Sequence, residues 1–178
     1  DAYGLTHDGD NLWTTDHPGS SSDPAIAIKF DEEGEISETF ELPDHYMSGI
    51  AYDNGDFWVT TYYISGSDVG HIYKLNSEGT IITDYQLSNE QPWDICTQDS
   101  FIWIADYNED MIYKTEAATG EVLESYESEG EDPAGIVYDG SYLWYCDEGQ
   151  DGFDYLYKVD LGGTGTPEIA IDPTELSF

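Results

Sequence analysis

Apolar residues recur along this chain in short runs of strand length, and the same arrangement of runs occurs four times. The clearest copy is GIAYDNGDFWVTT at residues 49–61, where two apolar runs flank a turn of Asp, Asn and Gly. The other copies are GLTHDGDNLWTTD (4–16), DICTQDSFIWIAD (94–106) and GIVYDGSYLWYCD (135–147). Asp, Asn and Gly tolerate the positive φ of tight hairpins, and aromatic and β-branched residues favour strands. Each copy therefore predicts a hairpin whose second strand is covered on both faces.

Two further strands follow each hairpin. The third-strand segments are AIAIKF (25–30), HIYKLN (71–76), MIYKTE (111–116) and YLYKVD (155–160). Polar residues alternate in EISETFEL (35–42), TIITDYQL (80–87) and EVLESYES (121–128), which is typical of an outer strand with one wet face. Four strands repeated at a period of 40 to 45 residues predict an all-β fold, a β-propeller of four-stranded antiparallel blades with four blades in this chain.

The positive charges follow the same period. The only four cations, Lys29, Lys74, Lys114 and Lys158, all occupy one position of the third strand. A ring of lysines could bind an anion, but repeated packing explains a repeated residue more simply. We expect each lysine to pair with a carboxylate, and the candidates are Asp16, Asp106 and Asp147 at the ends of the second strands.

The repeats divide the chain into a four-blade propeller unit, residues 1–161, and a tail, residues 162–178, rich in Gly and Pro at its start. The last blade has no clear fourth strand. Four blades could close on themselves, but they more easily form part of a larger ring, completed by further sequence or by a second chain. An incomplete ring would leave apolar blade faces exposed, so we expect a protein partner or self-association through the blade edges.

Charge excludes several classes of partner. The 178 residues carry 39 acidic side chains against four lysines, a formal net charge of -35. This charge opposes binding to nucleic acid and to anionic membranes, and no apolar run is long enough for a membrane-spanning helix. We expect a secreted or cell-surface protein in a salty or calcium-rich exterior, where ions screen the repulsion.

Two cysteines allow one disulfide without requiring it. Cys96 and Cys146 replace Thr or small apolar residues of the other copies, which favours two small buried side chains.

The repeat GI-x-YDG-x-YLW-x-x-D, followed by IYK-[LV]-[DN] and a TG-E-V turn, resembles the secreted bacterial β-propellers of the NHL-repeat, SMP-30/gluconolactonase and virginiamycin B lyase-like groups. The resemblance covers about residues 1–160 and implies the fold rather than a reaction, because the matched residues build blades. The tail PEIAIDPTELSF resembles the opening of an Ig-like module, which implies a multidomain secreted parent.

Candidate site residues are those that break the repeat at one end of the blades, where the loops into each blade and the loops between second and third strands meet. Aromatic rings there would stack on a glycan or grip a peptide. The binding candidates are Trp93, Asp94, Tyr107, Tyr62, Tyr63 and His45. Trp93 is the one tryptophan outside the repeat, and its alternative role is packing over the channel mouth or against a neighbouring blade.

An enzyme is the second hypothesis. Similarity to SMP-30-like lactonases implies a divalent metal held by carboxylate and Asn ligands, for which Asp94 replaces the Gly of the other copies. A lyase-like site would need a histidine, and His45 is the candidate. Calcium is the one cofactor that the sequence suggests. Asp147, Asp151 and Asp154 have EF-hand-like spacing, but the loop lacks an acidic third position, and a solvated loop explains these residues better. The function favoured by the sequence is a non-catalytic binding or assembly module, with a glycan-binding module as a further alternative.

Overall fold

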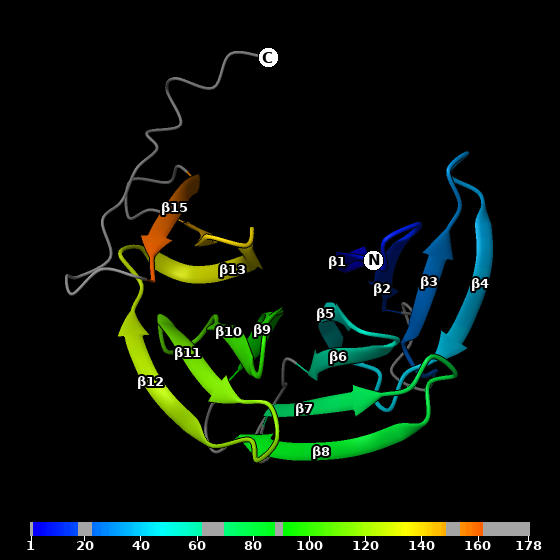
Figure 1. Cartoon of the computed structure of the whole chain (residues 1–178), viewed down its shortest axis with the longest axis horizontal. Coiled ribbons are helices and arrows are strands. Elements are labelled where there is room, and N and C mark those ends of the chain that lie inside the picture. The colour runs from blue at the N-terminus through cyan, green and yellow to red at the C-terminus, as the bar shows by residue number, and fades with distance from the viewer. Residues whose placement is uncertain (1, 18–22, 62–69, 88–90, 149–153, 162–178) are drawn as a thin grey trace. The chain divides into compact units, whose positions relative to one another are not determined.

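A computed structural model describes residues 2–17, 23–61, 70–87, 91–148 and 154–161. These residues form fifteen strands in four antiparallel sheets, and no helix occurs among them. Within each sheet the strands follow chain order, each pairing with the next (Figure 1). This is the blade topology of a β-propeller, and the predicted fold class is confirmed.

We number the four sheets as blades in chain order. Blade 1 contains β1 (Ala2–His7), β2 (Leu12–Asp16), β3 (Ile26–Phe30) and β4 (Ile36–Glu41). Blade 2 contains β5 (Met47–Asp53), β6 (Asp56–Thr61), β7 (Gly70–Leu75) and β8 (Ile81–Leu87). Blade 3 contains β9 (Pro92–Gln98), β10 (Phe101–Asp106), β11 (Met111–Glu116) and β12 (Val122–Glu127). Blade 4 contains β13 (Glu131–Tyr138), β14 (Tyr142–Glu148) and β15 (Asp154–Asp160), three strands within the described residues.

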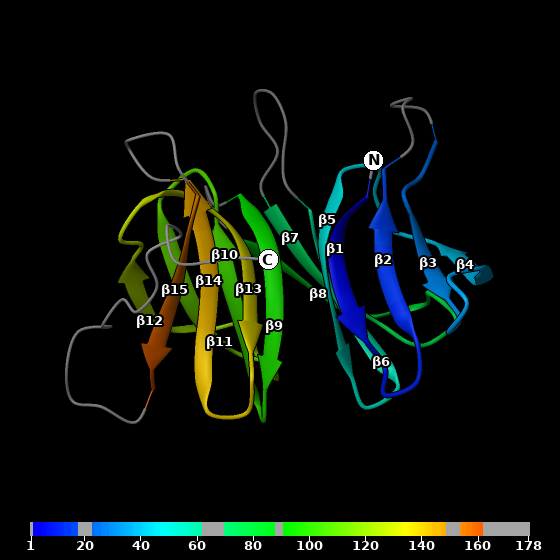
Figure 2. The same cartoon turned by 90° about the horizontal axis from the view of Figure 1, so that it is seen from above.

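The chain divides into two compact units, Asp1–Ile95 and Cys96–Phe178, so the boundary falls inside β9. Within each unit the tight turns between first and second strands lie at one end of the blades (Figure 2). These turns have the positive φ that their sequences predict, for example 52° at Asn54 and 107° at Gly9.

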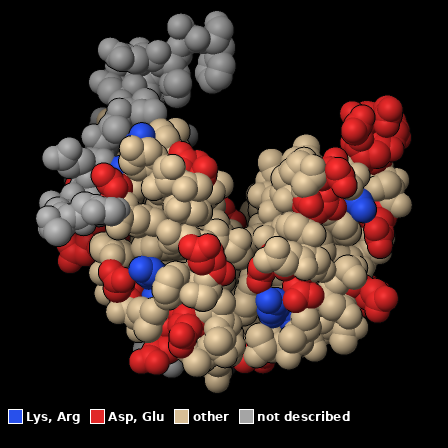
Figure 3. All heavy atoms as spheres, in the orientation of Figure 1, with Lys and Arg blue, Asp and Glu red and all other residues tan. Residues whose placement is uncertain are grey.

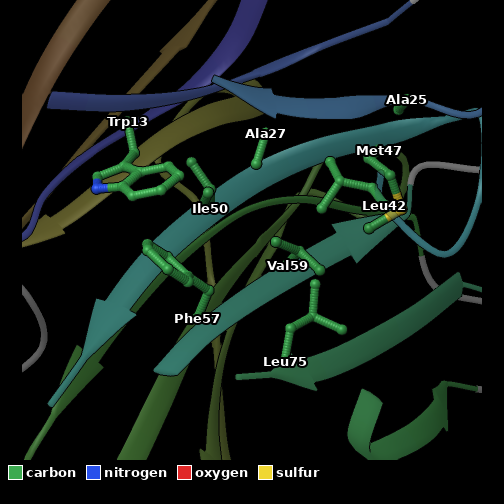
Figure 4. Packing of buried hydrophobic residues seen from close by; sticks show 9 residues of the cluster. All are labelled: Trp13, Ala25, Ala27, Leu42, Met47, Ile50, Phe57, Val59 and Leu75. Carbon is green, nitrogen blue, oxygen red and sulfur yellow. The ribbon is translucent and has the colours of Figure 1, made fainter. Parts of the chain in front are cut away.

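Blades 1 and 2 share an apolar core in the first unit. β1 and β2 pack on β5, and Trp13 lies 4.7 Å from Phe57 between ring centroids. Figure 4 shows Trp13, Ile50 and Phe57 directed toward one another, and Trp13 is only 4% exposed. The tryptophan of one blade therefore packs on the first and second strands of the next.

Blades 3 and 4 repeat this arrangement in the second unit. Trp103 shares a core with Ile136 and Leu143, which occupy the positions of Ile50 and Phe57. The repeated sequence thus makes a repeated contact between blades.

The lysines form the other repeated contact. Each lysine lies opposite the blade's tryptophan in the strand register, with its Nζ 5.2–5.5 Å from the indole centroid. In blade 2 Lys74 Nζ also lies 2.8 Å from Asp53 Oδ2, and Trp58 Nε1 donates to the same oxygen at 3.2 Å. An aspartate five residues before the tryptophan accepts its indole N–H likewise in blade 1 (Asp8, 2.8 Å) and blade 4 (Asp139, 2.7 Å).

The predicted lysine partners at the ends of the second strands are wrong. Lys29 pairs with Asp8 and Glu38, and Lys74 pairs with Asp53 and Asp56. Asp16 lies three residues beyond Trp13 on β2, about 10 Å along the strand. Because the lysine lies opposite the tryptophan, the nearer carboxylates are those of the turn between the first and second strands, such as Asp8 and Asp53.

Blade 3 departs from the pattern. Gln98 replaces the turn aspartate and still accepts the Trp103 Nε1 hydrogen bond at 2.8 Å, but it brings no charge. Lys114 therefore pairs with Glu124 of β12 at 3.1 Å, a carboxylate whose side chain is 49% exposed.

Candidate functional site

Buried hydroxyl groups fix the ends of the first strands in the first unit. Thr15 Oγ1 accepts the Gly4 N–H (3.1 Å) and donates to the Ser48 carbonyl (2.6 Å), which joins β1 to β5. Thr60 repeats the arrangement by accepting the Gly49 N–H (2.9 Å) and lying 3.4 Å from the carbonyl oxygen of Trp93. Both threonines are fully buried. They hold neighbouring first strands at a fixed separation.

Tyr3 and Trp93 come together at these strand ends. Both occupy the same repeat position, where blade 2 has Ser48 and blade 4 has Ala134. Their ring centroids are 5.8 Å apart with planes at 87°, an edge-to-face contact. Tyr3 is 39% exposed and Trp93 is half-buried. Trp93 of blade 3 therefore packs on a ring of blade 1, and this partner, Tyr3, carries no signal of its own in the sequence.

Asp94 lies against Gly49. A Cβ added to Gly49 would lie 2.7 Å from the Asp94 Cα and 2.8 Å from Asp94 Oδ1. Glycine at position 49 is therefore required for this approach, and it makes room for the one carboxylate that replaces glycine in the repeat.

His45 belongs to a different cluster of rings in the first unit. His45 packs edge-to-face on Tyr46 at 5.3 Å, and Tyr46 stacks on His17 at 5.2 Å. No ring contact joins His45 to Trp93 among the described residues. Tyr62 and Tyr63 lie outside the described residues.

Tyr107 lies in the β10–β11 turn of the second unit and is half-buried. The preceding Asp106 is fully buried, and its Oδ1 accepts the backbone N–H groups of Asn108 (3.1 Å) and Glu109 (3.0 Å). This aspartate shapes the turn that presents Tyr107.

Asp147 is a buried carboxylate in the second unit. It is 2% exposed, and its Oδ2 accepts hydrogen bonds from Ser128 Oγ (2.6 Å) and the Gly130 N–H (3.0 Å). Within the described part of the chain, Oδ1 has no hydrogen-bond partner. Burial raises the pKa of Asp147, and the charge of Asp110 raises it further. The hydrogen bonds from Ser128 and Gly130 lower this pKa but do not offset the burial.

Metal ligands do not gather in the described residues: no group of three or more His, Cys, Asp or Glu side chains there could hold a metal ion. Of the calcium candidates, Asp147 occupies the buried position above. Asp151 lies outside the described residues, and Asp154 is described only as the first residue of β15. Cys96 is buried and Cys146 half-buried, and no disulfide joins them.

Comparisons with known proteins give the fold. No family model and no curated protein matches the chain. Among solved structures, glutaminyl cyclase of Myxococcus xanthus is similar with a TM-score of 0.70 and 12% identity, over 93% of this chain and 68% of that chain. A chain of a nidogen/laminin complex has a TM-score of 0.67 and 18% identity, over 91% of this chain and 60% of that one. Virginiamycin B lyase from Staphylococcus aureus has a TM-score of 0.57 and 20% identity, over 81% of this chain and 47% of that one.

These similar structures include enzymes and a protein–protein complex, so at such identities they establish the propeller fold and no activity. The described residues also hold no helix with the length and apolar character needed to cross a membrane.

Proposed function

We propose that the chain is a non-catalytic binding module of a larger secreted or cell-surface protein, and that it recognises a basic segment of a protein partner. The observation that carries the proposal is the Tyr3–Trp93 ring pair, set at a repeat position where the other two blades have small side chains. Hydroxyl groups of Thr15 and Thr60 hold the strands that present the rings. A rigid pair of partly exposed rings binds at a low cost in conformational entropy.

Charge favours a basic partner over a neutral one. The net charge is -35, and acidic side chains are spread over the face shown in Figure 3 with isolated lysines among them. All four lysines of the chain already lie over rings within the blades. A lysine or arginine that packs on Trp93 would therefore come from another molecule, and the adjacent Asp94 adds a carboxylate to the same strand end.

Titration with short peptides tests the proposal. Pentalysine and pentaarginine are titrated into the protein by calorimetry, with a Gly-Ser pentapeptide as the neutral probe. Binding of the basic peptides is expected, and Trp93→Ala should weaken it about tenfold, because a partly desolvated cation–π contact contributes about 1–2 kcal/mol. Tyr85→Ala, which removes a half-buried ring of the outer strand β8 in the first unit, is the matched control and should leave binding unchanged. Equal binding by Trp93→Ala would mean that the peptide responds to net charge alone and would refute the site.

A glycan array on the same protein tests the alternative ligand. Binding of a neutral glycan, lost in Trp93→Ala, would replace the basic segment with a carbohydrate at the same rings.

Catalysis is the second candidate function, supported by Asp94 in place of the repeated glycine and by similarity to propellers that include a cyclase and a lyase. Metal content by mass spectrometry, followed by a lactone-hydrolysis screen, separates it from binding. A stoichiometric metal together with turnover that Asp94→Asn abolishes would establish the enzyme.

A further inference from the structure

Blade 1 exposes residues whose repeat counterparts are buried. Leu5 is 66% exposed, whereas its counterparts Ile50, Ile95 and Ile136 are 1%, 2% and 6% exposed. Leu12 is 46% exposed, whereas its counterparts Phe57, Ile102 and Leu143 are at most 2% exposed. We call Leu5 and Leu12 the blade-1 face. Its residues are apolar, like the buried residues at the same repeat positions of the other blades.

Blade 4 exposes residues on the other side of its first and second strands, the side that carries the repeated tryptophan. Val137 is 55% exposed, whereas its counterparts Ala51 and Cys96 are 5% and 7% exposed. Trp144 is half-buried, whereas the tryptophans of the other three blades are at most 4% exposed. We call Val137 and Trp144 the blade-4 face.

The packing between blades within each unit shows how two such faces fit. Trp13 packs on Phe57 and Ile50 of the following blade (Figure 4), and Trp103 packs with Leu143 and Ile136. By repeat position, Trp144 corresponds to Trp13 and Trp103. The blade-1 face corresponds to the surface on which those tryptophans pack.

We propose that the blade-4 face of one chain covers the blade-1 face of a second copy, with Trp144 packed on Leu5 and Leu12. Each copy offers one face of each kind, so two copies related by a two-fold axis make two identical contacts and close as a dimer. The contact continues the interface that already joins blades within each unit. It also removes an exposed apolar surface that soluble proteins rarely leave uncovered.

Charge sets the conditions for this dimer. Two chains of net charge -35 repel each other at low salt. At about 1 M NaCl the Debye length falls to about 3 Å, so the repulsion is screened and the apolar contact can form. Association should therefore strengthen with salt.

Sedimentation velocity in 1 M NaCl tests the proposal, with near-UV circular dichroism to confirm that each variant is folded. The wild-type chain should have twice its mass of 19.9 kDa. Leu5→Asp and Val137→Asp should each be monomeric, and Leu12→Asp is a second variant of the blade-1 face. Ile82→Asp is the matched control, since Ile82 is 54% exposed on the outer strand β8, and it should remain dimeric.

Mixing the two face variants identifies the pairing. In a mixed dimer of Leu5→Asp and Val137→Asp, one of the two contacts has two wild-type faces, so the mixture should associate more strongly than either variant alone. A monomeric wild-type chain in 1 M NaCl, growth beyond a dimer, or a Val137→Asp variant that dimerises normally would each overturn the proposal. Leu5→Asp should bind pentalysine as the wild-type chain does. Loss of the dimer can therefore be distinguished from loss of the proposed peptide site.

Discussion

Lys74 lies across the β6–β7 pair from Trp58, with its Nζ 5.2 Å from the indole centroid, and both side chains share Asp53. Lys74 and Asp53 are 22% and 20% exposed, so this ion pair is neither fully buried nor a surface pair. In blade 3 the ring and the lysine are retained but Gln98 replaces the carboxylate. A comparison of the two blades therefore separates the contribution of the ion pair to stability from that of the cation–π contact.

Replacement of Lys74 should cost more than replacement of Lys114. Lys74→Met removes a charged hydrogen bond of about 1.5–3 kcal/mol, and Asp53 is left half-buried without its cation. Lys114→Met loses a comparable ring contact, but its ion pair is with an exposed Glu124 and contributes about 1 kcal/mol or less. Urea unfolding at pH 7 measures both free energies, and equal losses would mean that the ring, rather than Asp53, accounts for the contribution of the lysine.

Asp53→Asn should destabilise the protein at pH 7 and have no effect in acid. Burial alone would raise the pKa of Asp53, but hydrogen bonds from Lys74 and Trp58 and the charge of Lys74 lower it below the usual value. The stability that ionised Asp53 adds is therefore present above the ordinary aspartate pKa of about 3.9 and is lost as the pH falls through the lower folded value. Unfolding free energies of the wild type and the variant between pH 2 and pH 7 should converge at the acid end. A constant difference would contradict the ion pair.

Asp147→Asn should have the opposite pH profile. The folded-state pKa of Asp147 is raised, so its ionised form opposes folding at neutral pH, and protonation relieves this as the pH falls. The amide oxygen can still accept from Ser128 and Gly130, while a charge next to Asp110 is removed. We expect the variant to be more stable than the wild type at pH 7, because the neutral amide avoids the cost of burying a charge beside Asp110. The difference should vanish below about pH 4. A variant that is less stable at pH 7 would show that Oδ1 has a partner in solution.

Thr15→Val should weaken the contact between β1 and β5. Valine fills the same volume but leaves the Gly4 N–H and the Ser48 carbonyl without their buried partner. The expected loss is about 1–3 kcal/mol in urea unfolding. Thr39→Val on the exposed outer strand β4 is the control and should change the free energy of unfolding by less than about 0.5 kcal/mol.

The blades could be predicted from the sequence because their signals are local and repeated. Apolar runs, turn residues and the Trp13–Lys29 spacing each lie within one repeat. The carboxylate that pairs with Lys29 cannot be predicted from the sequence, because a strand end and a hairpin turn both offer one and only the strand register shows which is near. The pairing of Tyr3 with Trp93 could not be predicted, since the two residues are 90 positions apart and meet only through contacts between successive first strands.

Asp147 shows the same limit. Its spacing to Asp151 and Asp154 suggested a calcium loop, yet its burial depends on Ser128 and Gly130, which approach from the connection between β12 and β13. The position of Asp147 near the end of the second strand can be predicted from the sequence, but the residues that bury its side chain cannot.

The repeated tryptophans build the blades, whereas Trp93 is proposed to bind a partner. Paired measurements on Trp58→Ala and Trp93→Ala, of unfolding free energy and of pentalysine binding, test this difference most directly. Trp58 is 1% exposed, so its removal should cost about 3–5 kcal/mol. Trp93→Ala should cost less, about 0.5–1.5 kcal/mol for the lost ring pair with Tyr3, and should bind the peptide about tenfold more weakly. A Trp93→Ala variant that is as unstable as Trp58→Ala, or that binds the peptide like the wild type, would contradict the account.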